Sequence, residues 1–278
     1  MIPKIIHYCW LSGDAVPDDY KRCMDSWNKN LPGYEFVLWD AERFDLNSVL
    51  WVKQAYEAKV YACAADYIRL YAVYNHGGIY LDMDMEVVKP FDPLLSNDLI
   101  LAYENHINKN IEAGCFGAAK NHPYIKKCME YFEKTPLFNP SLSEKIMSLP
   151  KSERHSFINP LILPEVMKNA GDDFFKKEAF NFYPCSYFTA KNILTGKIEK
   201  TDDAYTVHHF SSLYHSQEWL ENRNAEQRVY AKFGENAFSK TLVRLRTAAR
   251  RVKRRGFLKT VKYYFGVAAQ GKAKNGDF

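Results

Sequence analysis

Apolar and polar positions along the chain predict strands and helices in turn. Residues 2–10 form a dense apolar run, which favours a central parallel strand over an alternating surface strand. Residues 61–74 carry apolar side chains at helical spacing and predict a largely buried helix. The pattern also predicts strands at 34–40, 99–104, 180–188 and 204–210, and helices at 18–29, 44–61, 123–132 and 163–168. This order predicts an α/β fold, in which helices flank a mainly parallel central sheet.

The stretch of residues 61–87 changes from helix to strand at a pair of glycines. Residues 76–78 (His-Gly-Gly) end the helix, because glycine accepts the backbone conformation that a helix C-terminus prefers. Residues 79–81 begin a strand, and its period of two places Asp82 and Asp84 on the same side. A buried strand with two carboxylates on one face requires a cation to meet them.

The cation that fits these residues is a hard divalent ion. Two carboxylates without neighbouring cysteines or paired histidines favour Mg²⁺ or Mn²⁺ over Zn²⁺. Asp66 and Arg69 share a face of the preceding helix, either as part of the same site or as a structural salt bridge. Asp82 and Asp84 alone also fit a solvated strand end. The combination of helix, glycine turn, strand and paired aspartates favours a site.

Residues 65–69 (ADYIR) and 76–84 (HGGIYLDMD) resemble the sugar-binding DXD region of glycosyltransferase family 32. That family includes bacterial capsule and lipopolysaccharide sugar transferases and yeast-type mannosyltransferases, and it is related to the catalytic domain of the large glucosylating toxins. The resemblance is strong over residues 1 to about 90 and ends near residue 215. It implies a Rossmann-like GT-A fold, a nucleotide-sugar donor, a divalent metal and retention of anomeric configuration.

The resemblance also implies roles for individual residues. Trp10, at the end of the first strand, would stack on the nucleotide base; its alternative is a place in the core. The same resemblance implies that Asp82 and Asp84 bind the metal and that Asp66 holds sugar hydroxyls. It also implies that Arg69 faces the sugar or the phosphates and that Tyr80 lies near the sugar. His208 or His209 would supply a third metal ligand or contact the diphosphate; alternatively, one of the two histidines is buried, the other is solvated and neither has a role. Residues 159–160 (Asn-Pro) replace a Gly-Pro turn that the family often has at the sugar site.

Charge divides the chain into two predicted parts. The net charge is +5, but residues 236–278 carry 12 Lys or Arg against one acid, which leaves the remainder at about −6. We therefore expect a catalytic domain over 1–235 and a basic helical tail over 236–278. Apolar residues of the tail recur on one helical stripe: Phe238, Leu242, Leu245, Ala249 and Val252.

A basic amphipathic helix indicates contact with an anionic membrane surface. The alternatives are a solvated helix packed on the acidic domain and RNA binding, although no nucleic-acid module accompanies the charge. The sequence shows neither a signal peptide nor a membrane span, and its six cysteines are scattered. We expect a cytoplasmic protein, with a peripheral position on the inner face of the cell membrane.

The resemblance, together with the paired aspartates, implies a retaining, divalent-metal-dependent glycosyltransferase that moves a sugar from a nucleotide-sugar donor to a glycan or lipid-linked acceptor. Synthesis of a cell-surface polysaccharide such as capsule or lipopolysaccharide is the expected setting. Two other classes stay open. One is a non-catalytic, membrane-associated module that binds nucleotide sugars, and the other is a glycoside hydrolase with paired carboxylates.

Overall fold

The computed structural model describes residues 1–105, 110–149, 154, 163–177, 180, 182–211 and 217–255. The chain divides into two compact units. The larger unit comprises Met1–Asn192 and Ile198–His215, and the helical unit comprises Ile193–Lys197 and Ser216–Phe278. The predicted boundary at residue 235 therefore falls inside the helical unit.

A five-stranded sheet forms the centre of the larger unit, in the order β2-β1-β3-β6-β5. Strand β1 pairs in parallel with β2 on one side and with β3 on the other, whereas β6 is antiparallel to both β3 and β5. Four of the five strands therefore run in the same direction, which confirms the mainly parallel sheet. The strands are β1 (Ile5–Cys9), β2 (Glu35–Trp39), β3 (Gly78–Leu81), β5 (Leu99–Ile100) and β6 (Cys115–Ala118).

Two further strands form a small antiparallel sheet beside the main one. Strand β4 (Met85–Val87) pairs with β7 (Thr206–His208), which comes from a distant part of the chain. The register places Met85 opposite His208. This pairing brings the predicted histidine strand next to the paired aspartates.

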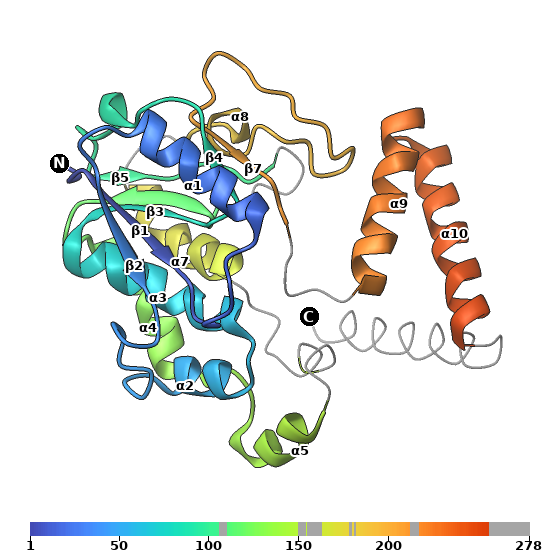
Figure 1. Cartoon of the computed structure of the whole chain (residues 1–278), viewed down its shortest axis with the longest axis horizontal. Helices are drawn as coiled ribbons and strands as arrows, with labels where there is room; N and C mark the ends of the chain where they lie inside the picture. The colour runs from blue at the N-terminus through green and yellow to red at the C-terminus, as the bar shows by residue number, and fades with distance from the viewer. Residues whose placement is uncertain are drawn as a thin grey trace. The chain divides into compact units, whose positions relative to one another are not determined.

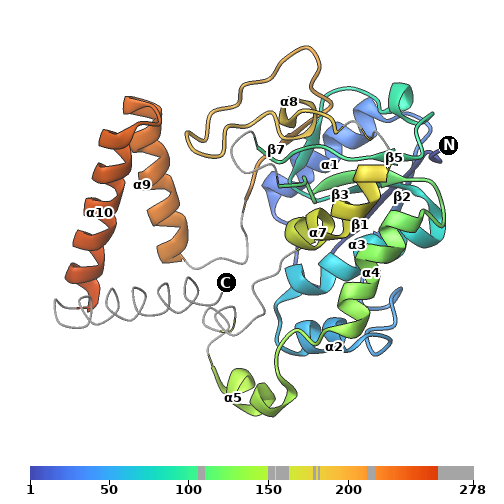
Figure 2. The same cartoon turned by 180° about the vertical axis from the view of Figure 1, so that it is seen from behind.

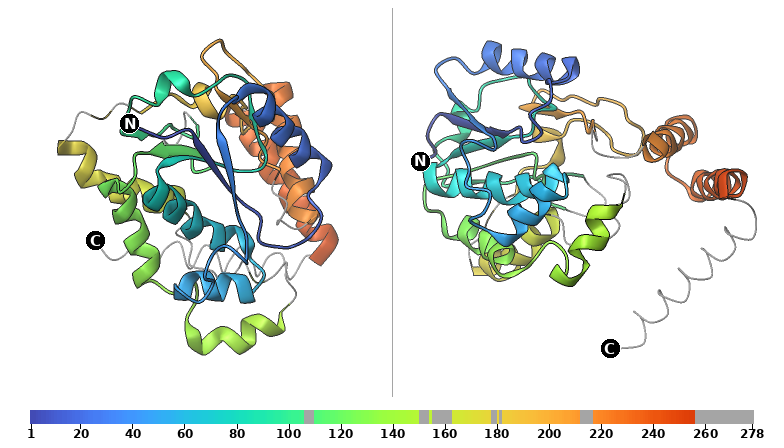
Figure 3. Two further views of the ribbon diagram at one scale, coloured as in Figure 1. Left: turned by 60° about the vertical axis from the view of Figure 1, so that its left-hand side comes forward. Right: turned by 60° about the horizontal axis from the view of Figure 1, so that its bottom comes forward.

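Helices cover both faces of the main sheet (Figures 1 and 2). Helix α1 lies over one face, and α3, α4 and α7 lie over the other, so that the larger unit has three layers (Figure 3). The helices of this unit are α1 (Asp18–Asn30), α2 (Leu50–Glu57), α3 (Tyr61–His76), α4 (Pro123–Lys134), α5 (Ser143–Ser148), α7 (Leu163–Lys177) and α8 (Cys185–Phe188), with 3₁₀ turns η1 (Asp92–Leu94) and η2 (Pro140–Leu142).

The strand period of two divides the core between these layers. Along β3, Ile79 and Leu81 pack on the α1 side, whereas Tyr80 packs on the α3 side. His7 of β1 also points toward α3, where its Nε2 lies 2.8 Å from the Gly77 carbonyl oxygen. Burial lowers the pKa of this histidine to about 4, which keeps it neutral. His7 is therefore a neutral, hydrogen-bonded histidine of the core.

The glycine pair turns the chain directly from α3 into β3. Gly77 has a φ of 68° and Gly78 a φ of 108°, both in the region that favours glycine. A Cβ atom on Gly78 would lie 2.6 Å from the carbonyl oxygen of Ile5 on the neighbouring strand. The turn thus fixes the distance between helix α3 and the residues that follow β3.

Two local predictions are wrong. Asp82 and Asp84 lie in a turn between β3 and β4 rather than on one face of a continuous strand, because the Met85 amide bonds back to the Asp82 carbonyl. The predicted strand at 180–188 is limited to a bridge between Ala102 and Tyr183, after which α8 begins. Pro184 precedes α8 at its N-cap, where a missing N–H costs no hydrogen bond.

The helical unit contains α9 (Gln217–Phe233) and α10 (Ala237–Arg255), which pack side by side (Figure 1). Helix α10 overlaps the predicted tail helix from residue 238 to residue 255, whereas α9 has no counterpart in the sequence-based prediction. The continuation of the tail to residue 265 and the Asn-Pro at 159–160 lie outside the described residues. Over those described residues, no helix is both long and apolar enough to cross a membrane.

Candidate active site

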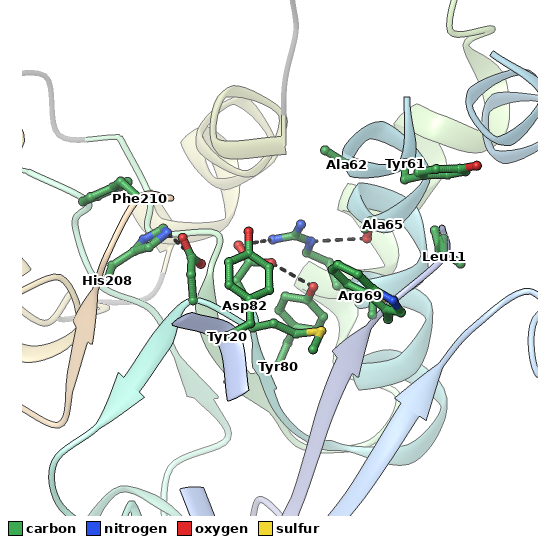
Figure 4. Close-up of a pocket in the computed structure, with 14 residues that line it drawn as sticks. Leu11, Tyr20, Tyr61, Ala62, Ala65, Arg69, Tyr80, Asp82, His208 and Phe210 are labelled. Carbon is green, nitrogen blue, oxygen red and sulfur yellow. Dashed lines mark hydrogen bonds and ion pairs between the residues drawn. The ribbon is translucent and has the colours of Figure 1, made fainter. Parts of the chain in front are cut away.

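A pocket opens where the parallel strands β1 and β3 end. Trp10 and Leu11 follow β1, Asp82 follows β3, and all three line the pocket. Nucleotide-binding α/β sheets place their ligands at this carboxyl edge. Helix α3 contributes Arg69 and the segment after β7 contributes Phe210, as Figure 4 shows.

Asp82 is held by two donors on the α3 side of the pocket. The Arg69 Nη1 lies 3.2 Å from Asp82 Oδ2, and the Tyr80 hydroxyl donates to Asp82 Oδ1 at 2.9 Å (Figure 4). The Arg69 guanidinium also donates to the carbonyls of Ala65 and Ala113 and lies 4.5 Å from the centroid of the Tyr80 ring. This fixed cation compensates the Asp82 charge without any ligand.

Asp66 joins the same network through Arg69. Its Oδ1 lies 3.5 Å from Arg69 Nη2, and its side chain is 16% exposed. Burial raises the pKa of Asp66 to about 7, although Arg69 opposes this shift. The structure therefore brings Asp66, Arg69, Tyr80 and Asp82 together, but Asp66 itself is not among the residues that line the pocket.

Asp84 has different partners. Its Oδ2 accepts a hydrogen bond from the Ser211 amide at 2.7 Å, and its Oδ1 lies 3.6 Å from His208 Nε2. Asp84 and His208 are both buried. Their proximity follows from the pairing of β4 with β7.

Glu112 contacts His208 at Nδ1, the ring nitrogen that does not face Asp84. The sequence analysis did not select this residue. Its Oε2 lies 3.1 Å from His208 Nδ1 and also accepts the Thr189 hydroxyl at 2.9 Å, while its Oε1 accepts the Gly114 amide at 2.7 Å. This carboxylate is 1% exposed. A buried carboxylate on one ring nitrogen orients the imidazole and leaves the other nitrogen free to face the pocket.

The carboxylates set the charge of His208. Burial disfavours the imidazolium, but Glu112 and Asp84 outweigh it and raise the pKa of His208 to about 10. Burial also acts to raise the pKa of Glu112, yet the contacts with His208, Gly114 and Thr189 outweigh it, and the pKa is lowered. His208 therefore carries a proton that compensates these acids when no metal ion does so.

Gly114 allows these side chains to converge. A Cβ atom at this position would lie 2.9 Å from Glu112 Oε1, 3.0 Å from Asp82 Oδ2 and 3.0 Å from His208 Cε1. The Gly114 carbonyl also accepts the Asp82 amide at 2.8 Å. A side chain larger than hydrogen at position 114 would therefore displace the residues of the site.

Asp82, Asp84 and His208 form a group that could hold a divalent metal ion. Each offers one ligand atom, and these atoms all lie within 4.8 Å of one another. Two carboxylates and one imidazole, with a third carboxylate, Glu112, on the other ring nitrogen, have the chemistry of a metal site. The donors therefore fit the ion that the sequence analysis expects.

His209 is not part of this group. Its Nε2 lies 3.0 Å from Glu86 Oε2, in a half-exposed pair. Because successive residues of a strand point to opposite faces, only one of the two histidines can face Asp84. The structure selects His208 for the pocket.

Trp10 lies on the pocket wall and is half-buried rather than part of the core. Its Nε1 donates to the Asp14 carbonyl at 2.8 Å, and its ring meets that of Tyr20 edge to face, with centroids 5.9 Å apart. Both rings line the pocket. An aromatic face at this place is available for a planar ligand.

Comparison with known proteins agrees with this arrangement. Residues 17–101 match the family model described as a glycosyltransferase sugar-binding region containing a DXD motif. The chain is 32% identical over 132 residues to inositol phosphoceramide mannosyltransferase 3 of Schizosaccharomyces pombe, covering 45% of this chain and 35% of that protein. It is 26% identical over 204 residues to an uncharacterized glycosyltransferase, L373, of Acanthamoeba polyphaga mimivirus, covering 69% of this chain and 77% of that protein.

Among solved structures, similarity extends to a glycosyltransferase involved in the glycosylation of the major capsid of PBCV-1. The identity is 15% and the TM-score is 0.40, over 81% of this chain and 98% of that chain.

A mainly parallel α/β sheet with a DXD turn at its carboxyl edge defines a GT-A type domain, and the larger unit has this form. The resemblance to the DXD sugar transferases of glycosyltransferase family 32 is confirmed by the match over residues 17–101. The chain spans less than half the length of the inositol phosphoceramide mannosyltransferases that it matches.

Proposed function

We propose that the protein is a glycosyltransferase that moves a sugar from a nucleotide-sugar donor to a glycan or lipid-linked acceptor. One observation carries the proposal: Asp82, Asp84 and His208 present ligand atoms within 4.8 Å of one another, in the pocket that Arg69 also lines. A nucleoside diphosphate joined to a sugar requires both a cation for its phosphates and polar contacts for its hydroxyls.

Asp82, Asp84 and His208 would hold Mn²⁺ or Mg²⁺. The imidazole nitrogen favours Mn²⁺, since Mg²⁺ prefers oxygen ligands. When bound, the ion supplies positive charge where negative charge develops on the departing diphosphate. The contacts of Glu112 with His208 Nδ1 keep the second ring nitrogen directed at this place.

The other residues of the pocket would position the donor. Arg69 lies beside the proposed metal ligands and faces either the sugar or the phosphates, while Asp66 holds the guanidinium from the other side. Tyr80 keeps Asp82 oriented through its hydroxyl. Trp10 offers its ring to the nucleotide base at the end of β1.

Retention of anomeric configuration is the stereochemical outcome that we propose. Of the described residues that line the pocket, Asp82 and Asp84 are the carboxylates, and both belong to the proposed metal site. No carboxylate is thus left there as a nucleophile for double displacement. The acceptor hydroxyl would attack from the side of the departing diphosphate and give its proton to a phosphate oxygen.

A hydrolase with paired carboxylates fits the geometry less well. Such a pair acts from opposite sides of the scissile bond, with about 5 Å or more between the carboxyl groups. Asp82 and Asp84 instead converge on the same histidine, with ligand atoms within 4.8 Å.

The names of the relatives suggest which substrates to test first. Three are inositol phosphoceramide mannosyltransferases, so we propose a mannosyl donor and a lipid-linked or phosphoinositol-containing acceptor as the first candidates. A growing cell-surface polysaccharide, such as capsule or lipopolysaccharide, is the alternative acceptor. Either acceptor suits an enzyme at the inner face of the cell membrane.

The experiment is a screen of nucleotide sugars with Mn²⁺ for thermal stabilisation, followed by assay of diphosphate release with those that bind. A donor present at about a hundred times its Kd stabilises the fold by about 2.7 kcal/mol. We expect stabilisation that requires both donor and metal, and release that chelator abolishes. Binding without turnover on any acceptor would favour the non-catalytic module, and chelator-resistant hydrolysis would favour the hydrolase.

A further inference from the structure

Helix α10 of the helical unit carries an apolar stripe that remains largely exposed. The stripe consists of Phe238, Leu242, Leu245, Ala249 and Val252. At 3.6 residues per turn these positions fall within about 80° of arc, so they form one narrow face. Phe238 is 61% exposed and Leu245 is 63% exposed. Such exposure of two large apolar side chains on one face indicates a surface that is covered in use.

Most of the α10 apolar stripe lies on a different face of α10 from the polar contacts with α9; the exception is Phe238, whose ring meets that of Phe233 at the end of α9. Helix α10 meets α9 through Thr247, whose hydroxyl lies 3.4 Å from Glu226 Oε1, and through Arg250, whose Nη1 lies 3.1 Å from Asn222 Oδ1. These contact positions lie about 120° to 180° around the helix from the stripe. The α9 residues that make these contacts, Glu226 and Asn222, thus lie opposite a different face of α10. Packing within the pair leaves Phe238, Leu245 and Ala249 exposed, whereas Leu242 and Val252 are half-buried.

Cations flank the stripe. Helix α10 holds eight Lys or Arg residues and no Asp or Glu. Arg244 and Arg246 are exposed and lie on either side of the stripe, about 120° and 80° from its centre. Arginine side chains in these positions reach outward past the apolar face while their stems pack along it.

The C-terminal end of α9 adds aromatic surface next to Phe238. The Phe233 and Phe238 rings meet edge to face, with centroids 5.3 Å apart, and Phe233 is 39% exposed. Lys232 Nζ lies 5.3 Å from the centroid of the Phe233 ring. Paired aromatic and basic side chains at one end of an amphipathic helix suit the boundary between headgroups and acyl chains.

We propose that the α10 apolar stripe docks this protein on an anionic lipid bilayer, with α10 lying in the plane of the headgroups. The stripe would enter the acyl boundary, while Arg244 and Arg246 bind lipid phosphates. An apolar face with cations on both sides favours lipid over nucleic acid. A phosphate backbone would pair with the cations but would not bury the exposed Phe238 and Leu245 side chains. None of the stripe residues lines the pocket of the candidate active site. Vesicle binding can therefore be measured without a sugar donor or acceptor.

The experiment is co-sedimentation of the full-length chain with vesicles of phosphatidylcholine alone and of phosphatidylcholine mixed with phosphatidylglycerol. We expect binding to the anionic vesicles that weakens at high salt. Arg244→Glu with Arg246→Glu should weaken it about thirtyfold or more, since each basic residue near the surface contributes about a factor of five. Phe238→Ser with Leu245→Ser should weaken it at least tenfold.

Matched controls come from the larger unit. Lys29→Glu with Lys53→Glu changes the net charge equally, and Leu50→Ser removes an apolar side chain that is 49% exposed. Both should leave vesicle binding within twofold of the native chain. Circular dichroism checks that each variant keeps its helix content.

Three results would overturn the proposal. The first is absence of vesicle binding, together with a fall in unfolding temperature on charge reversal, which would assign the stripe to packing on the acidic domain. The second is a dimer in solution that Phe238→Ser with Leu245→Ser dissociates. The third is binding to polynucleotides that the serine variant leaves unchanged while vesicle binding is weak or absent.

Discussion

The two ends of the DXD turn meet different kinds of positive charge. Asp82 meets Arg69, a permanent cation that two backbone carbonyls and Asp66 hold in place. Asp84 lies close to Nε2 of His208, a titratable group whose other nitrogen, Nδ1, contacts Glu112. The two aspartates are two residues apart, yet their charges are compensated differently. Arg69 compensates Asp82, and protonated His208 compensates Asp84.

This difference teaches how one short turn serves both stability and chemistry. Arginine stays charged in proteins, so the Asp82 contact is part of the folded structure in every state. Histidine can exchange its proton for a metal ion, because a metal ligand must be deprotonated. The Asp82 end therefore anchors the turn and also offers a ligand atom, whereas at the Asp84 end a bound cation would replace the proton of His208. Substitutions at the two ends should separate these effects.

The largest expected effect is on the anchoring end. Arg69→Met leaves Asp82 and Asp66 without their common buried partner and should lower the free energy of unfolding by about 3 kcal/mol. Urea unfolding followed by tryptophan fluorescence measures this loss. Arg22→Met is the matched control, since the Arg22–Asp19 pair is exposed and should contribute about 0.5 kcal/mol or less. Equal losses in the two variants would refute an anchoring role for Arg69.

Asp84→Asn should act on the other end. The amide oxygen still accepts the Ser211 N–H, so the fold should stay intact, while metal-dependent diphosphate release falls about a hundredfold or more. The readouts are donor turnover across a Mn²⁺ titration and the unfolding midpoint. Glu86→Gln on the adjoining strand serves as control and should retain turnover. Native turnover in Asp84→Asn would exclude the proposed role.

Glu112→Gln tests whether the contact of Glu112 with His208 Nδ1 contributes to metal affinity. The amide carries no charge and holds the imidazole less firmly, so Mn²⁺ affinity should fall about 10- to 100-fold. Electron paramagnetic resonance of free Mn²⁺ measures the affinity directly, without any substrate. Glu112→Asp keeps the charge and should recover part of the loss. A purely structural role would lower the unfolding temperature while leaving Mn²⁺ affinity native.

Tyr80→Phe gives the smallest expected effect. It removes one hydrogen bond to Asp82, while Arg69 still holds the carboxylate, so stability should fall by about 1 kcal/mol. Turnover should decrease only severalfold. A loss as large as that of Asp84→Asn would show that the Tyr80 hydroxyl, rather than Arg69, sets the position of Asp82.

The local parts of this site were predictable from the sequence. Helix α3, the glycine turn and β3 follow from contiguous patterns, because helical spacing and glycine chemistry act over a few residues. Asp82 and Asp84 were selected for the same reason. Their placement on a strand was wrong, since the hydrogen bond from Met85 to Asp82 closes a turn that alternation alone does not reveal.

The long-range parts were not predictable in the same way. The choice of His208 over His209 depends on the register of β7 against β4, strands that lie more than a hundred residues apart in the chain. Glu112 reaches His208 only after β6 and β7 are placed, and its signal was a lone acid among small apolar residues. Helix α9 was missed because its apolar positions are sparse.

The most direct test of the account is Mn²⁺ binding to the native chain and to His208→Ala and His209→Ala, measured by electron paramagnetic resonance in the absence of substrate. The two variants remove the same side chain from adjacent residues on opposite faces of one strand segment. We predict that His209→Ala binds one ion with native affinity and that His208→Ala binds it at least tenfold more weakly. Equal affinity in both variants, or no binding by the native chain even with a nucleoside diphosphate present, would contradict the account.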